Sequence, residues 1–152
     1  MFTLDTSVHL NALSGAEQGS SESEAFLEQI FRRPWPVFSP TLLLVEVAAA
    51  VARAFDDTGQ GLAIAEAIHE LPGEVWVPLD KALSEAAARL GAEHRLRGAD
   101  AVFAAVAHRY GTTLVTRDRQ QLERLRSALP VLTPGEALAH LAEIQKDANQ
   151  GP

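Results

Sequence analysis

The chain has 152 residues, no cysteine and an apolar fraction of 47%. This length suits one domain with its own core, the apolar fraction argues against wholesale disorder, and the absence of cysteine excludes disulfides and zinc–thiolate sites. A net charge of −7 is unfavourable for binding nucleic acid. No apolar run is long enough to cross a membrane, and residues 1–10 lack the features of a signal peptide, so we expect a cytoplasmic protein without membrane contact.

In the first half of the chain, short apolar runs alternate with helical patterns. The expected elements are a strand at 1–4, a helix at 5–13, a loop at 14–21, a helix at 21–33, a strand at 36–39, and helices at 39–55 and 59–71. Asp5 or Thr6 is expected to cap the first helix, and Pro34 to help end the second. Ser39 is expected to cap the third helix, with Pro40 at its first position.

The second half repeats this alternation. The expected elements are a strand at 74–79, a helix at 80–96 capped by Asp80, a helix opened by Asp100, a strand at 112–116, a helix at 119–129, a strand at 130–134 and a helix at 134–146. Strands alternating with helices predict an α/β sandwich with a mostly parallel, short-stranded central sheet flanked by helices. We expect a single domain over residues 1–147 and a flexible tail at 148–152.

Glu46 is the only charged residue between positions 40 and 52. It shares one helix face with Leu43, Val47 and Ala50, because these positions follow the 3–4 spacing of an amphipathic helix. A buried carboxylate is costly unless it is paired or binds a cation. Either this face borders solvent, or an arginine pairs with Glu46, or Glu46 contributes to a cation site.

Three aspartates stand at the ends of predicted elements. Asp5 and Asp118 follow strands, and Asp100 lies in the first turn of a helix, so each alone could serve as a helix cap. In an open parallel sheet, however, strand ends and the following helix starts share one edge. Converging carboxylates repel one another without a cation, and an all-oxygen ligand set suits Mg²⁺ or Mn²⁺. Together with Glu46, these residues predict an acidic metal site.

The pattern resembles the PIN-domain family, most closely the VapC-type toxins of bacterial toxin–antitoxin pairs. The residues that carry the resemblance are "LDTSV", the glutamate in "LLLVEVAAA", "LRGADAVFAAVA" and "LVTRD". The resemblance implies that Asp5, Glu46, Asp100 and Asp118 hold Mg²⁺ or Mn²⁺ and support cleavage of RNA, with Thr116 and Thr6 in supporting roles. It also implies a homodimer that a cognate antitoxin protein inhibits. Gln120 and Gln121 stand where related sequences often carry a further acid or asparagine. The sequence therefore leaves open whether the site binds one metal ion or two.

We therefore expect a metal-dependent endoribonuclease, with Asp5 and Asp100 as the main direct ligands. Glu46 and Asp118 would bind through water or orient the attacking water. The segment from Arg89 to Arg126 carries eight arginines against four acids, a local charge of +4 that offsets the acidic total. Candidate phosphate contacts in it are Arg95, Arg97, Arg117 and Arg119, and each of them could equally be a surface or interface residue.

Two other functions stay open at this point. A PIN-like scaffold without catalytic activity would bind partners through the same fold. A phospho-receiver domain would also place acids and Mg²⁺ at strand ends, but it should carry a lysine after a late strand. Lys81 and Lys146 are the only lysines, and neither follows an apolar strand.

Overall fold

The structure is a computed structural model that describes residues 1–33 and 35–149. Its strands are β1 (Phe2–Leu4), β2 (Val37–Pro40), β3 (Glu74–Val77), β4 (Thr113–Val115) and β5 (Val131–Leu132). They form one sheet in the order β3-β2-β1-β4-β5, and every strand pair is parallel. Because β1 and β4 are neighbours with Leu4 opposite Val115, the residues that follow these two strands emerge side by side.

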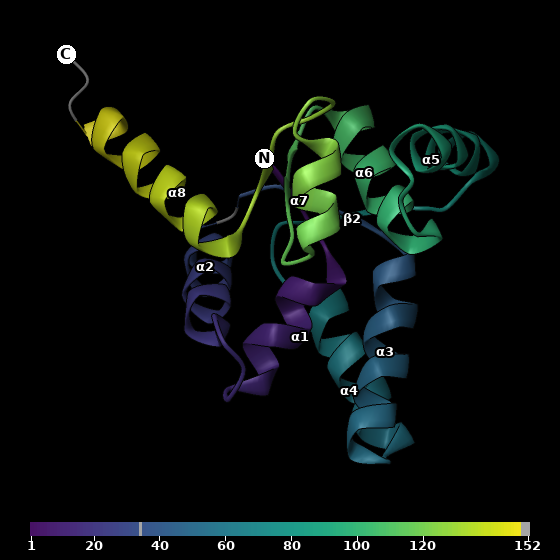
Figure 1. Ribbon diagram of the computed structural model, residues 1–152. Coiled ribbons are helices and arrows are strands. Elements are labelled where there is room, and N and C mark those ends of the chain that lie inside the picture. Colours follow the sequence, from purple (N-terminus) through teal and green to yellow (C-terminus); the bar gives the residue numbers. More distant parts are fainter. Residues whose placement is uncertain (34, 150–152) are drawn as a thin grey trace.

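Eight helices surround this sheet in the described part of the chain. They are α1 (Thr6–Ser14), α2 (Ser20–Arg32), α3 (Leu42–Phe55), α4 (Thr58–His69), α5 (Lys81–His94), α6 (Gly98–Tyr110), α7 (Arg119–Leu125) and α8 (Pro134–Asn149). Figure 1 shows that α2 and α8 lie together, that α3 and α4 form a second pair, and that α5 packs beside α6. Asp5 and Asp118 cap α1 and α7, as Asp80 caps α5, by accepting backbone N–H groups of the first turn.

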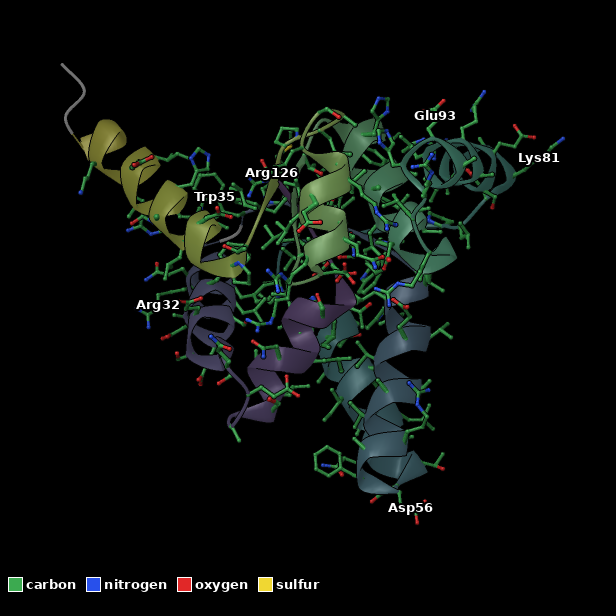
Figure 2. The ribbon with its side chains drawn as sticks, viewed as in Figure 1. Arg32, Trp35, Asp56, Lys81, Glu93 and Arg126 are labelled. Atoms are coloured by element: carbon green, nitrogen blue, oxygen red, sulfur yellow. The ribbon has the colours of Figure 1, made fainter. Side chains whose placement is uncertain are left out.

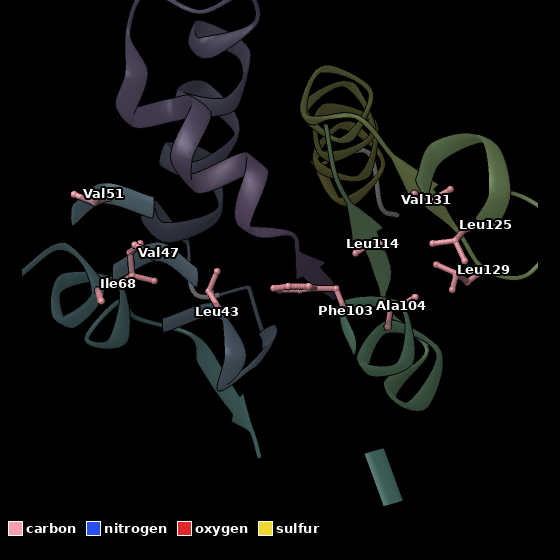
Figure 3. Close-up of a cluster of buried hydrophobic side chains, with 12 residues drawn as sticks. Leu43, Val47, Val51, Ile68, Phe103, Ala104, Leu114, Leu125, Leu129 and Val131 are labelled. Carbon is pink, nitrogen blue, oxygen red and sulfur yellow. The ribbon is translucent and has the colours of Figure 1, made fainter. Parts of the chain in front are cut away.

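The core lies on both faces of the sheet because neighbouring residues of a strand point to opposite sides. Phe2 and Leu4 face the helices α2 and α8, whereas Leu114 joins the apolar cluster of α3, α4, α6 and α7. Phe103 of α6 is fully buried in the middle of this second cluster, and its ring points toward Leu43 of α3 (Figure 3). Helix α6 therefore fixes α3, which carries Glu46, against the sheet.

The predicted architecture is confirmed, but the predicted start of the third helix is wrong. Ser39 does not cap a helix, and Pro40 does not open one: both belong to β2, opposite Trp76 and Val77 of β3. The backbone N–H of Thr41 continues this pairing by bonding to the carbonyl of Val77, so α3 begins only at Leu42. Long-range pairing with β3 thus outweighs the local preference for a cap.

Two other predictions concern the ends of elements. Residues 148–149 of the predicted tail belong to α8, while residues 150–152 and Pro34 lie outside the described residues. Among the described residues, no helix combines the length and apolar character needed to cross a membrane.

Most charged side chains stand at the periphery. The labelled Arg32, Asp56, Lys81 and Glu93 project outward from their helices (Figure 2). Asp5 and Asp100 differ, because only 6% and 8% of their surfaces are exposed. Buried acids at one edge of the sheet are therefore a distinct feature of this molecule.

Candidate active site

The four acids predicted from the sequence come from four elements at the carboxyl edge of the sheet. Asp5 follows β1, Asp118 follows β4, Glu46 lies in α3, and Asp100 lies in the first turn of α6. Asp5, Glu46 and Asp100 line one open cavity of about 500 Å³. Asp118 is not part of the cavity wall, but Arg97, which is, forms an ion pair with it.

A hydrogen-bond network fixes Asp5 between the ends of β1 and β4. Its Oδ2 accepts hydrogen bonds from the backbone N–H and hydroxyl of Ser7, and from the hydroxyl of Thr116 at 3.0 Å. The Ser7 hydroxyl in turn accepts the backbone N–H of Arg117, and the Thr116 hydroxyl accepts that of Asp118. None of the hydrogen bonds found among the described residues uses Oδ1 of Asp5, which leaves this oxygen available to a ligand.

Burial and crowding of negative charge disfavour ionisation of two of these acids. Burial raises the pKa of Asp5, the hydrogen bonds from Ser7 and Thr116 lower it, and the nearby Asp100 raises it again. Burial likewise raises the pKa of Glu46, which lies half-buried in the cavity wall. The Thr6 hydroxyl donates a hydrogen bond to Glu46 and offsets part of this rise, whereas Asp5 and Asp100 add to it.

Arg97 supplies positive charge at this edge of the sheet. Its Nε donates to Oδ2 of Asp100 at 2.8 Å, and a terminal nitrogen of the same guanidinium donates to Oδ2 of Asp118. The hydrogen bond to Asp100, together with the charges of Asp100 and Asp118, raises the pKa of Arg97. Arg97 therefore joins two acids of the site that are 18 positions apart in the sequence.

The donor set fits Mg²⁺ or Mn²⁺ in its chemistry, because Asp5, Glu46 and Asp100 offer only carboxylate oxygens to the cavity. A cation in the cavity would also relieve the unfavourable burial of Asp5 and Glu46. As the side chains lie, no three acidic or histidine side chains among residues 1–33 and 35–149 form a ready-made metal cluster. Arg97 holds Asp100 instead, so a metal ion would require side chains to rearrange.

The other predicted residues take up varied positions. Thr6 and Thr116 bond directly to Glu46 and Asp5, respectively. Arg117 donates from its guanidinium to the carbonyl of Gln18 and so ties down the loop between α1 and α2. Arg119 begins α7 with an exposed side chain, and Arg95 ends α5 with a left-handed φ of 54°.

Two residues of the site were not found from the sequence. Ser7 holds Asp5, and its signal is the Asp-x-Ser spacing of a side chain that bonds to a backbone N–H two residues on. Arg53 lines the cavity, and its signal is the seven-residue spacing from Glu46, which returns to the same face of α3.

An acidic cavity at the carboxyl edge of a five-stranded parallel sheet places this protein among the α/β proteins whose ligand sites lie at the strand ends. The family described as "PIN domain" matches residues 2–128. The chain belongs to the PIN-domain family. A comparison with curated proteins gives no match.

Solved structures with the same fold share little sequence with this chain. A toxin–antitoxin complex from Klebsiella pneumoniae is similar with a TM-score of 0.64 and 19% identity, over 88% of this chain and 98% of that one. VapBC2 from Rickettsia felis, bound to a DNA fragment from its promoter, is similar with a TM-score of 0.66 and 14% identity, over 87% of this chain and 97% of that one. VapC20 from Mycobacterium tuberculosis, a toxin that cleaves the sarcin–ricin loop, is similar with a TM-score of 0.63 and 16% identity, over 74% of this chain and 85% of that one.

Proposed function

We propose that this protein is a Mg²⁺- or Mn²⁺-dependent endoribonuclease that acts as the toxin of a toxin–antitoxin pair. The observation that carries the proposal is the convergence of Asp5, Glu46 and Asp100, from three separate elements, on one cavity. Membership in the PIN-domain family and the likeness to toxin structures support it. Membership in the PIN-domain family also argues against the alternative of a phospho-receiver domain.

A bound divalent ion would supply an activated water and neutralise charge on the phosphate that is cleaved. Asp5 and Asp100 would hold the ion directly, and Glu46 and Asp118 would bind through water or orient it. Ser7 and Thr116 would keep Asp5 in place between β1 and β4, and Thr6 would orient Glu46.

The experiment that tests this proposal uses purified protein, total RNA and two variants. Cleavage should require Mg²⁺ or Mn²⁺ and stop in EDTA, and Asp100→Asn should abolish it. Asp57→Asn is the matched control, because Asp57 caps α4 and does not line the cavity, and asparagine also caps well. Undiminished cleavage in excess chelator, or by Asp100→Asn, would sink the proposed mechanism. Inactive protein that binds Mn²⁺ would favour the PIN-like scaffold instead.

Sequencing the ends of the RNA fragments would identify the RNA that is cut and the position of the cut. The same fragments distinguish a nuclease with one target from a general one. Melting curves add a check that does not depend on the substrate. Mn²⁺ should raise the melting temperature of the wild type, because a ligand that binds only the folded state stabilises it, and should raise that of Asp100→Asn much less.

The antitoxin is expected to be a protein that covers apolar surface. A groove of about 450 Å³ between α1, α2 and α4 is lined mainly by apolar side chains, among them Leu13, Leu27 and Phe31. Glu24 and Glu28 also line it, which favours a partner segment that carries apolar residues flanked by basic ones. Phe31→Glu should prevent complex formation with the antitoxin and leave RNA cleavage intact. Sedimentation of the free protein tests the expected homodimer.

A further inference from the structure

We propose that Arg97 is a resident cation of the acidic site: its guanidinium neutralises Asp100 and Asp118 in the metal-free protein and has to leave before a divalent ion can use these carboxylates. This inference rests on the proposed metal dependence and adds a competition between a side chain and the metal. It assigns to Arg97 the role of a positioning residue that controls entry to the site.

The contacts of Arg97 occupy one oxygen of each of two site carboxylates and place its positive charge beside both of them. Nε donates to Oδ2 of Asp100 at 2.8 Å, and a terminal nitrogen donates to Oδ2 of Asp118. A planar guanidinium with several donors suits such a bridge between two carboxylates, whereas an ammonium group does not match its geometry.

The exposure of the three side chains shows which partner can move. The side chain of Arg97 is 68% exposed, compared with 11% for Asp100 and 21% for Asp118. The arginine can therefore turn into water at low cost, since exposed ion pairs contribute little to stability. Asp100 is fixed in the first turn of α6, and Asp118 is fixed as the cap of α7. The carboxylates stay in place while the cation is exchanged.

Charge also argues for exchange rather than coexistence. A divalent ion held by Asp100 would meet the guanidinium at contact distance, and like charges repel at such separations. Without any cation, the carboxylates of Asp5, Glu46 and Asp100 would line one cavity and repel one another. A single positive group, either the guanidinium or the metal ion, avoids both the repulsion between two cations and the repulsion among the carboxylates.

The test measures metal binding without RNA. The proteins are wild type, Arg97→Gln, Arg97→Lys and Arg89→Gln, the last of which removes an exposed arginine from α5 and serves as the charge-matched control. For each protein, calorimetry gives the dissociation constant of Mn²⁺, and melting curves in EDTA and in Mn²⁺ give the stabilisation by the metal.

We expect Arg97→Gln to bind Mn²⁺ about three- to tenfold more tightly than the wild type, because it has lost one or two weak ion pairs that compete with the metal. Its melting temperature in EDTA should be lower than that of the wild type, and Mn²⁺ should raise its melting temperature by more. Arg97→Lys should lie between the two, and Arg89→Gln should match the wild type. If Arg97→Gln does not fold, the tighter binding of Arg97→Lys carries the test.

Equal or weaker Mn²⁺ binding by Arg97→Gln overturns the competition, and the proposed function then stands on its own whenever the wild type binds Mn²⁺. If neither protein binds Mn²⁺, the metal-dependent function fails and this inference fails with it. If Arg89→Gln also binds Mn²⁺ more tightly than the wild type, the effect comes from net charge, and the role of Arg97 is overturned.

Discussion

The hydroxyl of Thr116 donates a hydrogen bond to the carboxylate of Asp5 at 3.0 Å, across a separation of 111 positions in the sequence. The same hydroxyl accepts the backbone N–H of Asp118. One buried threonine thus links the ends of β1 and β4 and holds two of the predicted site acids.

Thr116→Val should separate this role from simple packing, because valine keeps the shape and removes the hydroxyl. The buried Asp5 would lose a donor, and the N–H of Asp118 would lose its acceptor, so the free energy of unfolding should fall by about 1–3 kcal/mol. RNA cleavage should fall as well. Thr116→Ser restores the hydroxyl and should recover most of both quantities. Denaturant unfolding and initial cleavage rates check this, and an equally impaired serine variant would contradict it.

Arg53→Gln should weaken the binding of RNA. Arg53 is exposed, lines the same cavity as Glu46 and stands two helical turns from it, about 10 Å along α3. We expect a higher KM with little change in kcat, and a slope of log binding constant against log salt that is smaller by about 0.7, as for one lost phosphate contact with a single strand. Arg32→Gln, in the last turn of α2, is the control. An unchanged salt slope would remove Arg53 from the RNA-binding surface.

Glu74 and His9 should give the stability a pH dependence away from the site. Burial raises the pKa of Glu74 to about 7, and burial lowers the pKa of His9 to about 4. The Ser39 hydroxyl lies near Glu74 and offsets part of the rise, although no hydrogen bond of acceptable geometry reaches either carboxylate oxygen within the described residues. Both groups are buried in the form that is neutral.

The two effects have opposite signs. The contribution of Glu74 is fully present below its unfolded pKa of 4.5 and is lost as the pH rises through about 7. That of His9 is present above its unfolded pKa of 6.5 and is lost as the pH falls toward about 4. Between pH 4.5 and 6.5 the contributions of these two residues cancel to a large extent.

Glu74→Gln should remove one side of this balance. At pH 8 the variant should be more stable than the wild type by up to about 3 kcal/mol, because no buried charge forms. Compared with the wild type, its stability should rise with pH between 4.5 and 7, since Glu74 no longer opposes the His9 contribution. Urea unfolding at several pH values checks this, with Glu93→Gln on the exposed face of α5 as control. If the free energy of unfolding depends on pH in the same way for the wild type and for Glu74→Gln, the raised pKa of Glu74 is contradicted.

Gly61→Ala should destabilise the α3–α4 pair. A Cβ at Gly61 would stand 2.5 Å from the carbonyl oxygen of Ala48 and 2.9 Å from the Cβ of Ala52, so the two helices would have to separate. The expected loss is about 1–3 kcal/mol, although alanine is the better helix former by about 1 kcal/mol. Gly59→Ala in the same helix meets only the side chain of Asp57, at 3.3 Å, and should cost no stability. Thermal melts of both variants decide between packing and helix propensity.

The order of strands and helices could be predicted from the sequence because hydrophobic spacing and caps are local signals. The placement of Asp5 and Asp118 at one edge also followed, since parallel strands deliver their ends together. The extension of β2 over Ser39 and Pro40 could not be predicted, because it depends on pairing with β3. Nor could the bridge from Arg97 to Asp118, which depends on how α6 and α7 pack beside the sheet.

The wide spacing of the site residues has a consequence for synthesis of the protein. Asp5 is made well before Thr116 and Asp118, which follow 111 and 113 positions later in the sequence. Because β4 must insert beside β1 before Asp5 is fixed, a nascent chain that has not reached Thr116 carries an incomplete site. The same holds for any proteolytic fragment that lacks Asp5 or Thr116. A cell that makes this protein therefore completes the acidic cavity only in finished, folded molecules.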